Sequence, residues 1–409
     1  MTTTNISKKT FIVFLIAFSV ILFVAIRLLP HMDKISISQP PMIITEFTVM
    51  SLSDHGPDTL RDVINRVNRQ QASARIIFKS EGSIRLEEPL PALISDGATL
   101  DGGGKIRIDA SEISETGYAW TLKGDGQTVL GLAIAGKGGN GLLMLSKNSG
   151  VEKCVFDGLG IAISIGANHV YVKDSVFSKN VIAVEVLDEA QFSDITANKI
   201  RNSKKSAVWA VWKQRKTPAL LKIEKNEVSG NETGVVLAVE NAKLLGNHMT
   251  SNKVAVHALS SNSIEIIANE IYQNTQQGIV LEETTVSSVS RNSIYQNGIS
   301  GLLMKRSPGN RIDGNQIYSN GAYGVAEVMS NAKSSILHNS ITGNFISDNG
   351  DGIYMAASSP LIKDNIITKN RTSGIMIQDR AAGASGITSN PRIETQREMT
   401  DSVKGGPNE

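Results

Sequence analysis

The C-terminal half of the chain repeats one pattern of polar and aliphatic positions. An Asn is followed two residues later by an aliphatic residue, and three residues after that by a second Asn. The pattern returns at intervals of about 23 residues. It stands at 226–231, 247–252, 269–274, 292–297, 315–320, 339–344 and 365–370.

A short apolar segment that begins with Gly follows most of these patterns, as in Gly278-Ile-Val-Leu and Gly301-Leu-Leu-Met. Helical repeats are disfavoured, because Asn, Gly, Ser and β-branched residues dominate and no apolar face recurs at helical spacing. Short strands separated by turns at a constant period predict a coil that stacks on itself with parallel strands. The predicted fold is an all-β parallel β-helix over residues 46–380, with Asn side chains bonded amide to amide between coils.

An amphipathic helix is predicted directly after Asp58 and Thr59. Its apolar face consists of Leu60, Val63, Ile64 and Val67. An open β-helix exposes unpaired strand edges, so we expect this helix to cap the N-terminal end. The periodicity stops near Ala381, and residues 381–409 are predicted to be a flexible tail.

The N-terminal region predicts a membrane anchor. Residues 10–29 are almost entirely apolar, and 27–30 offer no small-x-small cleavage site. We therefore expect an uncleaved transmembrane signal-anchor at 10–29, followed by a linker over 30–45. Lys8 and Lys9 precede it, so residues 1–9 are expected to be cytoplasmic and the bulk of the chain periplasmic or extracellular.

Composition narrows the classes of ligand. The 409 residues contain 41 Lys and Arg against 39 Asp and Glu, so nucleic acid is not an expected partner. Cys154 is the single cysteine, which excludes an intramolecular disulfide and a thiolate metal cage. No His spacing, EF-hand or P-loop predicts a metal site, and no cofactor other than Ca²⁺ is considered.

One segment near the N-terminus and the Asn repeat together resemble a known superfamily. Asp54-x-Gly56-Pro57-Asp58-Thr59-Leu60-Arg61, followed by the Asn-x-Ile-x-x-Asn coils, is similar to right-handed parallel β-helix, or pectin-lyase-like, proteins. The resemblance spans about Phe47 to Asp379 and implies a right-handed coil. Such proteins include polysaccharide lyases, hydrolases, epimerases and carbohydrate-binding proteins. Neither Asp-Pro-His-Asp nor Gly-His-Gly is present, so no catalytic branch is matched.

Equivalent residues of adjacent coils should lie about 4.8 Å apart and form columns on the surface. One column begins Glu227, His248 and Glu270, where two carboxylates flank an imidazole and could bind substrate or transfer protons. The alternative is a solvated ladder of polar groups.

A second column holds Tyr272, Tyr295 and Tyr318, with Ser229 and Thr250 before them and Thr342 after. Stacked phenols could receive sugar rings. The alternative is an aromatic stack that only stiffens the sheet.

A third column is predicted to contain His257, Glu282 and Lys305. A base, an acid and a cation in adjacent coils could abstract the C5 proton of a uronate, and these are the candidate catalytic residues. An exposed charge ladder would explain them equally well.

Two further features suggest contact surfaces. A basic segment surrounds Trp209 and Trp212 and is expected to project as a loop that clamps an anionic glycan or is simply solvated. The residues of that segment are Lys204, Lys205, Lys213, Arg215 and Lys216. The apolar strands are expected to point Ala162, Val236, Ala255, Val280, Leu303, Tyr354 and Met376 outward, a face that a protein partner of the envelope could cover.

These features favour a membrane-anchored, extracytoplasmic β-helix that binds or handles polysaccharide in the cell envelope, in assembly or export. Two alternatives stay open. The first is a polysaccharide lyase or C5-epimerase acting on a uronate-containing glycan. The second is a structural scaffold that docks an envelope partner.

Overall fold

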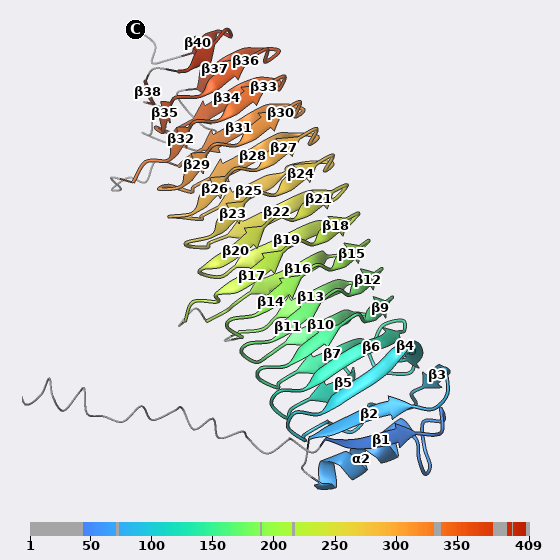
Figure 1. Ribbon diagram of the computed structural model, residues 1–409. Helices are drawn as coiled ribbons and strands as arrows, with labels where there is room; N and C mark the ends of the chain where they lie inside the picture. Colours follow the sequence, from blue (N-terminus) through green and yellow to red (C-terminus); the bar gives the residue numbers. More distant parts are fainter. Residues whose placement is uncertain are drawn as a thin grey trace, which may run out of the picture. The chain divides into compact units, whose positions relative to one another are not determined.

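The computed structural model describes residues 44–70, 73–188, 190–214, 217–330, 337–378, 391–394 and 396–405. These residues form a solenoid of stacked coils with two parallel sheets, of 27 and 13 strands (Figure 1). The all-β, parallel β-helix prediction is confirmed. The predicted transmembrane segment lies outside the described residues, and within them no helix is long and apolar enough to cross a membrane.

Each complete coil supplies three strands, two to the 27-stranded sheet and one to the 13-stranded sheet. The 27-stranded sheet therefore contains two rows, which we call the first row and the second row. It begins with β1 (Thr45–Val49), β2 (Ala74–Phe78), β3 (Gly82–Arg85), β4 (Thr99–Asp109) and β6 (Thr128–Ala135). The first row consists of β8 (Gly150–Glu152), β11 (Tyr171–Lys173), β14 (Asp194–Thr196), β17 (Leu221–Glu224), β20 (Ala242–Leu245), β23 (Glu265–Ile267), β26 (Ser288–Ser290), β29 (Arg311–Asp313), β32 (Ser340–Thr342), β35 (Leu361–Lys363) and β38 (Arg392–Ile393).

The second row consists of β9 (Val155–Asp157), β12 (Val176–Ser178), β15 (Lys199–Arg201), β18 (Glu227–Ser229), β21 (His248–Thr250), β24 (Glu270–Tyr272), β27 (Ser293–Tyr295), β30 (Gln316–Tyr318), β33 (Phe345–Ser347), β36 (Ile366–Thr368) and β39 (Glu398–Met399). The 13-stranded sheet consists of β5 (Tyr118–Leu122), β7 (Asn140–Met144), β10 (Ile161–Ile165), β13 (Ile182–Val186), β16 (Ser206–Val211), β19 (Thr233–Ala238), β22 (Val254–Leu259), β25 (Ile279–Glu282), β28 (Ser300–Lys305), β31 (Tyr323–Val328), β34 (Asp351–Ala356), β37 (Ser373–Gln378) and β40 (Val403–Gly405).

The helix α2 (Leu60–Gln70) packs on β1 at the N-terminal end of the stack (Figure 1). Its buried face is the predicted one. Thr59 caps it, because its Oγ1 accepts the N–H of Asp62 at 3.3 Å. Arg61 donates to Asp54 Oδ1 at 2.7 Å, and the same carboxylate accepts the N–H of Glu87 at 3.0 Å. The predicted capping helix is thus confirmed, and the Asp54–Arg61 pair ties it to the next coil.

Two ladders of buried Asn side chains run along the turns that flank the second row. Asn247 shows the pattern: its Oδ1 accepts both the N–H and the Nδ2 of Asn226 at 3.0 Å, and its Nδ2 donates to Asn269 Oδ1 at 2.9 Å. The same Nδ2 also donates to the carbonyl of Ile223 at 2.9 Å. Every donor and acceptor of the amide is therefore used, as a buried polar group requires.

The first ladder contains Asn198, Asn226, Asn247, Asn269, Asn292, Asn315, Asn344 and Asn365. The second contains Asn231, Asn252, Asn274, Asn297, Asn320, Asn349 and Asn370. The predicted amide-to-amide stacking is confirmed in both.

The structure corrects the predicted register of one coil. The sequence pattern equates Asn339 with Asn315, but Asn344 occupies the coil above Asn315, and Asn339 accepts the backbone N–H of Asn310 instead. The coil carries the Asn-x-Ile-x-x-Asn pattern twice in succession, once in each row, so a regular period alone selects the wrong copy. Thr342 accordingly lies beside Asp313 in the first row, and Ser347 is the residue that follows Tyr318.

The C-terminal region also differs from the prediction of a flexible tail from residue 381. Strands β38, β39 and β40 add a further coil. Gln396 Oε1 accepts the Nδ2 of Asn365 at 3.1 Å, and Asp401 Oδ2 accepts the Nδ2 of Asn370 at 2.9 Å. Gln and Asp thus replace Asn at the two ladder positions, which hides this coil from a search for Asn.

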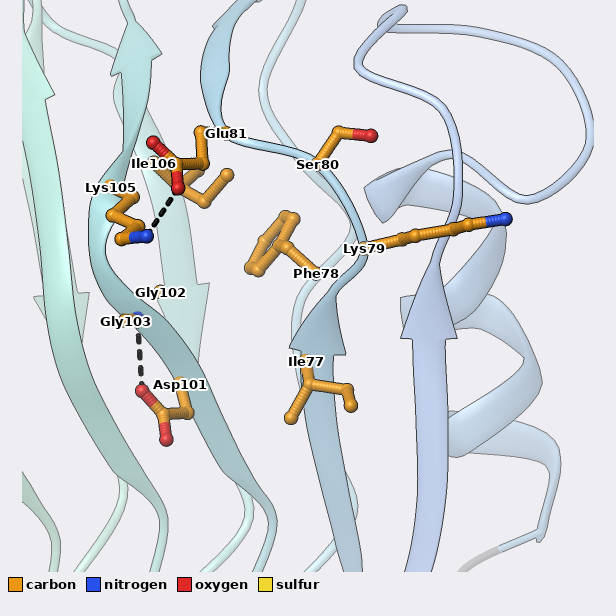
Figure 2. Close-up of a pocket in the computed structure, with 10 residues that line it drawn as sticks. All are labelled: Ile77, Phe78, Lys79, Ser80, Glu81, Asp101, Gly102, Gly103, Lys105 and Ile106. Atoms are coloured by element: carbon orange, nitrogen blue, oxygen red, sulfur yellow. Dashed lines mark hydrogen bonds and ion pairs between the residues drawn. The ribbon is translucent and has the colours of Figure 1, made fainter.

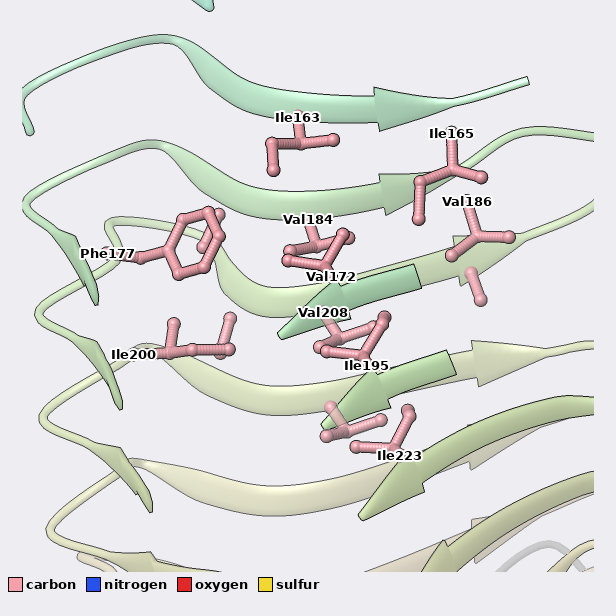
Figure 3. Packing of buried hydrophobic residues seen from close by; sticks show 14 of the residues in the cluster. Ile163, Ile165, Val172, Phe177, Val184, Val186, Ile195, Ile200, Val208 and Ile223 are labelled. Atoms are coloured by element: carbon pink, nitrogen blue, oxygen red, sulfur yellow. The ribbon is translucent and has the colours of Figure 1, made fainter. Parts of the chain in front are cut away.

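The core between the three walls is filled by aliphatic residues in register. Figure 3 shows Val184, Val208 and Ile223 pointing inward from successive coils. Phe156 and Phe177 stack inside the core with ring centroids 5.0 Å apart. Because each inward residue meets its equivalent in the next coil, the core consists of continuous columns.

One acidic side chain, Glu327, lies in this core between Met304 and Met355. It is 1% exposed, and its Oε2 has no hydrogen-bond partner among the described residues. Burial raises the pKa of Glu327 to about 7, despite hydrogen bonds with Asn339 and Ser358 that lower it.

The ladders predict a large loss of stability for Asn269→Ala. The change leaves the backbone N–H and Nδ2 of Asn247 and the carbonyl of Leu244 without their partner. Unsatisfied buried groups cost about 1 to 3 kcal/mol each, so we expect a loss of about 3 kcal/mol or more in urea unfolding. Ser293→Ala, an outward change in the next coil, is the control and should shift stability by less than about 0.5 kcal/mol. Equal shifts would contradict the ladder's role.

The buried carboxyl predicts a pH-dependent stability that Glu327→Gln removes. The folded-state pKa lies above the ordinary value of 4.5, so the stabilising effect of the protonated form is complete below pH 4.5 and is lost as the pH rises through about 7. Relative to the variant, the parent's free energy of unfolding should fall by roughly 3 kcal/mol between pH 4.5 and about pH 7. Denaturation at a series of pH values measures this. A parent and variant with parallel stability profiles would show that Glu327 is not held neutral.

Candidate functional site

The predicted column of Glu227, His248 and Glu270 exists on the outer surface of the second row. The three residues are register partners in β18, β21 and β24, and Ser293 and Gln316 continue the column. The inward neighbours Val228, Met249 and Ile271 are buried in the core, which leaves the alternate residues facing outward.

Glu270 links the acid–imidazole column to the tyrosines. Its Oε2 lies 2.7 Å from His248 Nδ1, and its Oε1 accepts the hydroxyl of Tyr295 at 2.7 Å. With Glu270 ionised, Nδ1 of neutral His248 must carry the proton, so Nε2 keeps its lone pair. The His248 side chain is 60% exposed and open to a ligand.

The other carboxylate of the column is paired with two cations. Glu227 Oε1 lies 3.3 Å from Lys199 Nζ, and its Oε2 lies 3.7 Å from Arg201. All three side chains are about half exposed, so these ion pairs contribute little to stability. They leave Arg201 with donors that a ligand can use.

The predicted tyrosine column is also present, and its geometry changes its interpretation. Tyr272 and Tyr295 have ring centroids 5.0 Å apart and planes within 5°, and Tyr295 and Tyr318 are 4.8 Å apart and within 3°. Burial raises the pKa of Tyr295, and the hydrogen bond to Glu270 raises it further. Because the rings cover one another, Tyr295 offers no face to a sugar. Only the outer faces of Tyr272 and Tyr318 are free of the stack.

A hollow of about 360 Å³ lies where the tyrosine column stops. It is lined by Arg201, Glu227, Ser229, His248, Thr250 and Tyr272, and we call it the Tyr272 hollow. Ser229 and Thr250 occupy the tyrosine position in the two preceding coils, and their small side chains leave the space open. The hollow therefore joins a free aromatic face to a cation, a carboxylate, an imidazole and two hydroxyls.

Of the predicted column of His257, Glu282 and Lys305, Glu282 and Lys305 are register partners, and His257 is displaced by two residues. His257 pairs with Val280, and Leu259 is the register partner of Glu282. The side chains nevertheless meet, since His257 Nε2 lies 3.5 Å and Lys305 Nζ 3.1 Å from the Glu282 carboxylate.

Glu282 is poorly suited to proton transfer. Burial raises its pKa, but the hydrogen bond and charge of Lys305, with His257 and Arg306, lower the pKa below its ordinary value overall. Arg306 also lies 2.9 Å from Glu282 and 3.0 Å from Glu283. His257 Nε2 is buried, away from any approaching ligand. These contacts favour the structural alternative, a network of charges.

The two tryptophans differ in their surroundings, and the structure contradicts a substrate-binding role for Trp212. Its indole is 3% exposed, belongs to the core and donates to the carbonyl of Val186 at 3.3 Å. Trp209 is half-buried in β16, and Lys205 Nζ lies 3.6 Å from its ring centroid. The segment from Ser206 to Val211 is thus a strand and not part of a projecting loop. Arg215 and Lys216 lie outside the described residues.

The predicted apolar outer face of the 13-stranded sheet is present with two corrections. Val236, Val280, Leu303, Tyr354 and Met376 share one outward column, which also contains Trp209, His257 and Ala326. Ala162 and Ala255 are completely buried. Ala255 occupies the position that Gly234 holds in the preceding coil, since Val235 pairs with Val256. A protein partner on this face stays a prediction.

One polar cluster on the same sheet carries no sequence signal. Ser164 Oγ donates to Glu185 Oε2 at 2.9 Å and lies 2.6 Å from the Tyr118 hydroxyl. The three residues come from separate coils that share no sequence pattern around them, so only the fold brings them together. Within the described residues, no three His, Cys, Asp or Glu side chains are placed to hold a metal ion.

A second hollow, of about 270 Å³, lies near the N-terminal end beside a bulge in β4 (Figure 2). Phe78 points into it, Lys105 pairs with Glu81, and Asp101 Oδ1 accepts the N–H of Gly103 at 2.9 Å. Gly103 has φ 60°, which glycine adopts at low cost. Glu81, Lys105 and Asp101 are thus engaged in contacts within the protein, which the bulge brings together.

Comparison with known proteins settles the fold. Residues 212–346 match the family model described as a right-handed β-helix region. The chain is a right-handed parallel β-helix. This is the fold of the pectin-lyase-like superfamily that the sequence resembles. No curated protein matches the chain significantly in sequence.

Three solved structures illustrate the likeness of this β-helix. The periplasmic alginate epimerase AlgG has a TM-score of 0.53 at 16% identity, over 85% of this chain and 84% of that one. The A-module of Azotobacter vinelandii mannuronan C-5 epimerase AlgE6 has a TM-score of 0.55 at 14% identity, over 87% and 100%. A mutant tailspike of E. coli bacteriophage HK620, in complex with a pentasaccharide, has a TM-score of 0.54 at 12% identity, over 82% and 74%. At these identities the likeness concerns the fold.

Proposed function

We propose that this β-helix binds polysaccharide and that one sugar unit sits in the Tyr272 hollow. The observation that carries the proposal is the free face of Tyr272 beside the hydroxyls and charged groups of the same hollow. A sugar ring has an apolar C–H face and a hydroxyl rim, which match an aromatic face flanked by hydrogen-bonding groups.

The structural neighbours support a carbohydrate ligand. Two are named as alginate or mannuronan epimerases, and one is a tailspike complexed with a pentasaccharide. The place of binding, outside a membrane that residues 10–29 span, stays a prediction from the sequence.

The proposal predicts that Tyr272→Ala weakens glycan binding. Calorimetric titration of the full chain with oligomers of mannuronan, polygalacturonate and dextran measures this. The loss of an aromatic contact in the hollow should cost about 1 to 3 kcal/mol. Tyr318→Ala is the matched control, because Tyr318 ends the same stack but does not line the hollow. If no glycan binds the parent, or if both variants lose affinity equally, the proposal is wrong.

A second candidate function is catalysis at the same hollow on a uronate glycan. His248 lines the hollow with a free Nε2, and Glu270 orients its ring. Nε2 could accept the C5 proton while Arg201 stabilises the enolate that receives the electron pair. Return of a proton to the opposite face would give epimerisation, and loss of the C4 substituent would give a lyase product.

Incorporation of deuterium at C5 from deuterated water reports epimerisation, and the absorbance of the C4–C5 double bond reports the lyase product. His248→Gln should lower the exchange rate on mannuronan roughly 10²-fold or more, with binding largely retained. His257→Gln should leave the rate unchanged, because that imidazole nitrogen is buried against Glu282. A parent that neither incorporates deuterium at C5 nor forms the unsaturated product would exclude catalysis on mannuronan and leave the binding proposal standing. An effect of His257→Gln alone would move the site to the 13-stranded sheet.

A further inference from the structure

The turn before each first-row strand from β8 to β29 holds one residue in the left-handed conformation, and these residues form a column on the surface. The φ angles are 57° at His169, 55° at Phe192, 49° at Leu220, 55° at Asn241 and 55° at Ser263. Asn tolerates this conformation well, whereas a bulky apolar side chain adopts it at a cost in free energy.

Phe192 and Leu220 gain little packing in return for that cost. Phe192 is 44% exposed and Leu220 is 40% exposed. Phe192 stacks one face on His169 at 4.7 Å, which leaves its other face directed toward the coil of Leu220. The coil sets the left-handed conformation at this position, but it does not require an exposed apolar side chain there, and exposed apolar groups that lie together are typical of contact surfaces.

These residues border a groove of about 500 Å³, which we call the Leu220 groove. The turn residues Asn241 and Ser263 also line it, as do the strand residues Lys243 and Glu265, which form an ion pair at 3.1 Å. Apolar groups on one side and paired charges of both signs on the other suit an amphipathic, polyhydroxylated chain. They do not suit nucleic acid, which requires an excess of cations.

The Leu220 groove and the Tyr272 hollow share the coil formed by β20 and β21. Asn241 and Lys243 of this coil line the groove, and His248 and Thr250 line the hollow. Between them lie Leu245 and Gly246, both half-buried. The eight residues from Lys243 to Thr250 are separated by seven steps and span at most about 23 Å.

We propose that a single polysaccharide chain lies along this coil, across the two rows, and fills the Leu220 groove and the Tyr272 hollow together. The inference rests on the proposed function, to which it adds a second contact site and a direction for the glycan. Binding at both sites by one chain makes affinity depend on chain length, because the second contact is intramolecular.

The test uses the double variant Phe192→Asn with Leu220→Asn, titrated with mannuronan and dextran oligomers from disaccharides to long chains. Asn is the native residue at the equivalent position 241, so the variant should fold at least as stably as the parent. Long oligomers should lose about tenfold or more in affinity, and disaccharides, held in the Tyr272 hollow, should lose none.

Val286→Asn is the matched control. Val286 stands in the same column of turns with φ 51° and is 55% exposed, but it does not line the groove. Its replacement should leave every affinity unchanged. Unchanged binding of long oligomers by the double variant would overturn the inference while the binding function stands. A parent that binds neither of these glycans, nor polygalacturonate, at any length would overturn both.

Discussion

The hydrogen bonds between stacked Asn side chains are the constraint on which the rest of this β-helix depends. Each amide in the ladders accepts from the preceding coil and donates to the next, so a shift of one coil by a single residue would break several buried hydrogen bonds at once. The ladders flank the second row on both sides. They therefore fix which residues of the second-row strands from β18 to β36 face the solvent.

A constant register places equivalent outward residues in a straight column. The candidate binding sites lie where the residue type changes along a column. The tyrosine column is continuous over three coils and covers its own faces. It becomes a site only at Tyr272, where Thr250 and Ser229 take the next two positions. The Leu220 groove forms in the same way, where Phe192 and Leu220 give way to Asn241 and Ser263.

The fold and two of the outward columns could be predicted because their information is local and repeated. The residues of both columns stand at a fixed number of positions after a ladder Asn. The pattern therefore aligned Glu227, His248, Glu270 and the three tyrosines correctly. The same reasoning failed at Asn339, where the pattern occurs twice within one coil. In the 13-stranded sheet, the prediction used the Gly before each strand to align the coils. Ala255 takes the place of that Gly in its coil, so the predicted position of His257 was wrong by two residues.

The hollows could not be predicted because they depend on three-dimensional facts that a pattern does not contain. Whether a tyrosine face is free depends on its neighbour in space, and Trp212 is buried although its segment is basic. The left-handed conformation of Phe192 and Leu220 likewise becomes visible only in the coil geometry.

The most direct measurement is a crystal structure of the chain with a bound oligosaccharide. The account predicts a sugar ring against the outer face of Tyr272, with the chain running along the coil of His248 toward Leu220. An oligosaccharide bound instead on the outer face of the 13-stranded sheet, along the column from Val236 to Met376, would contradict it.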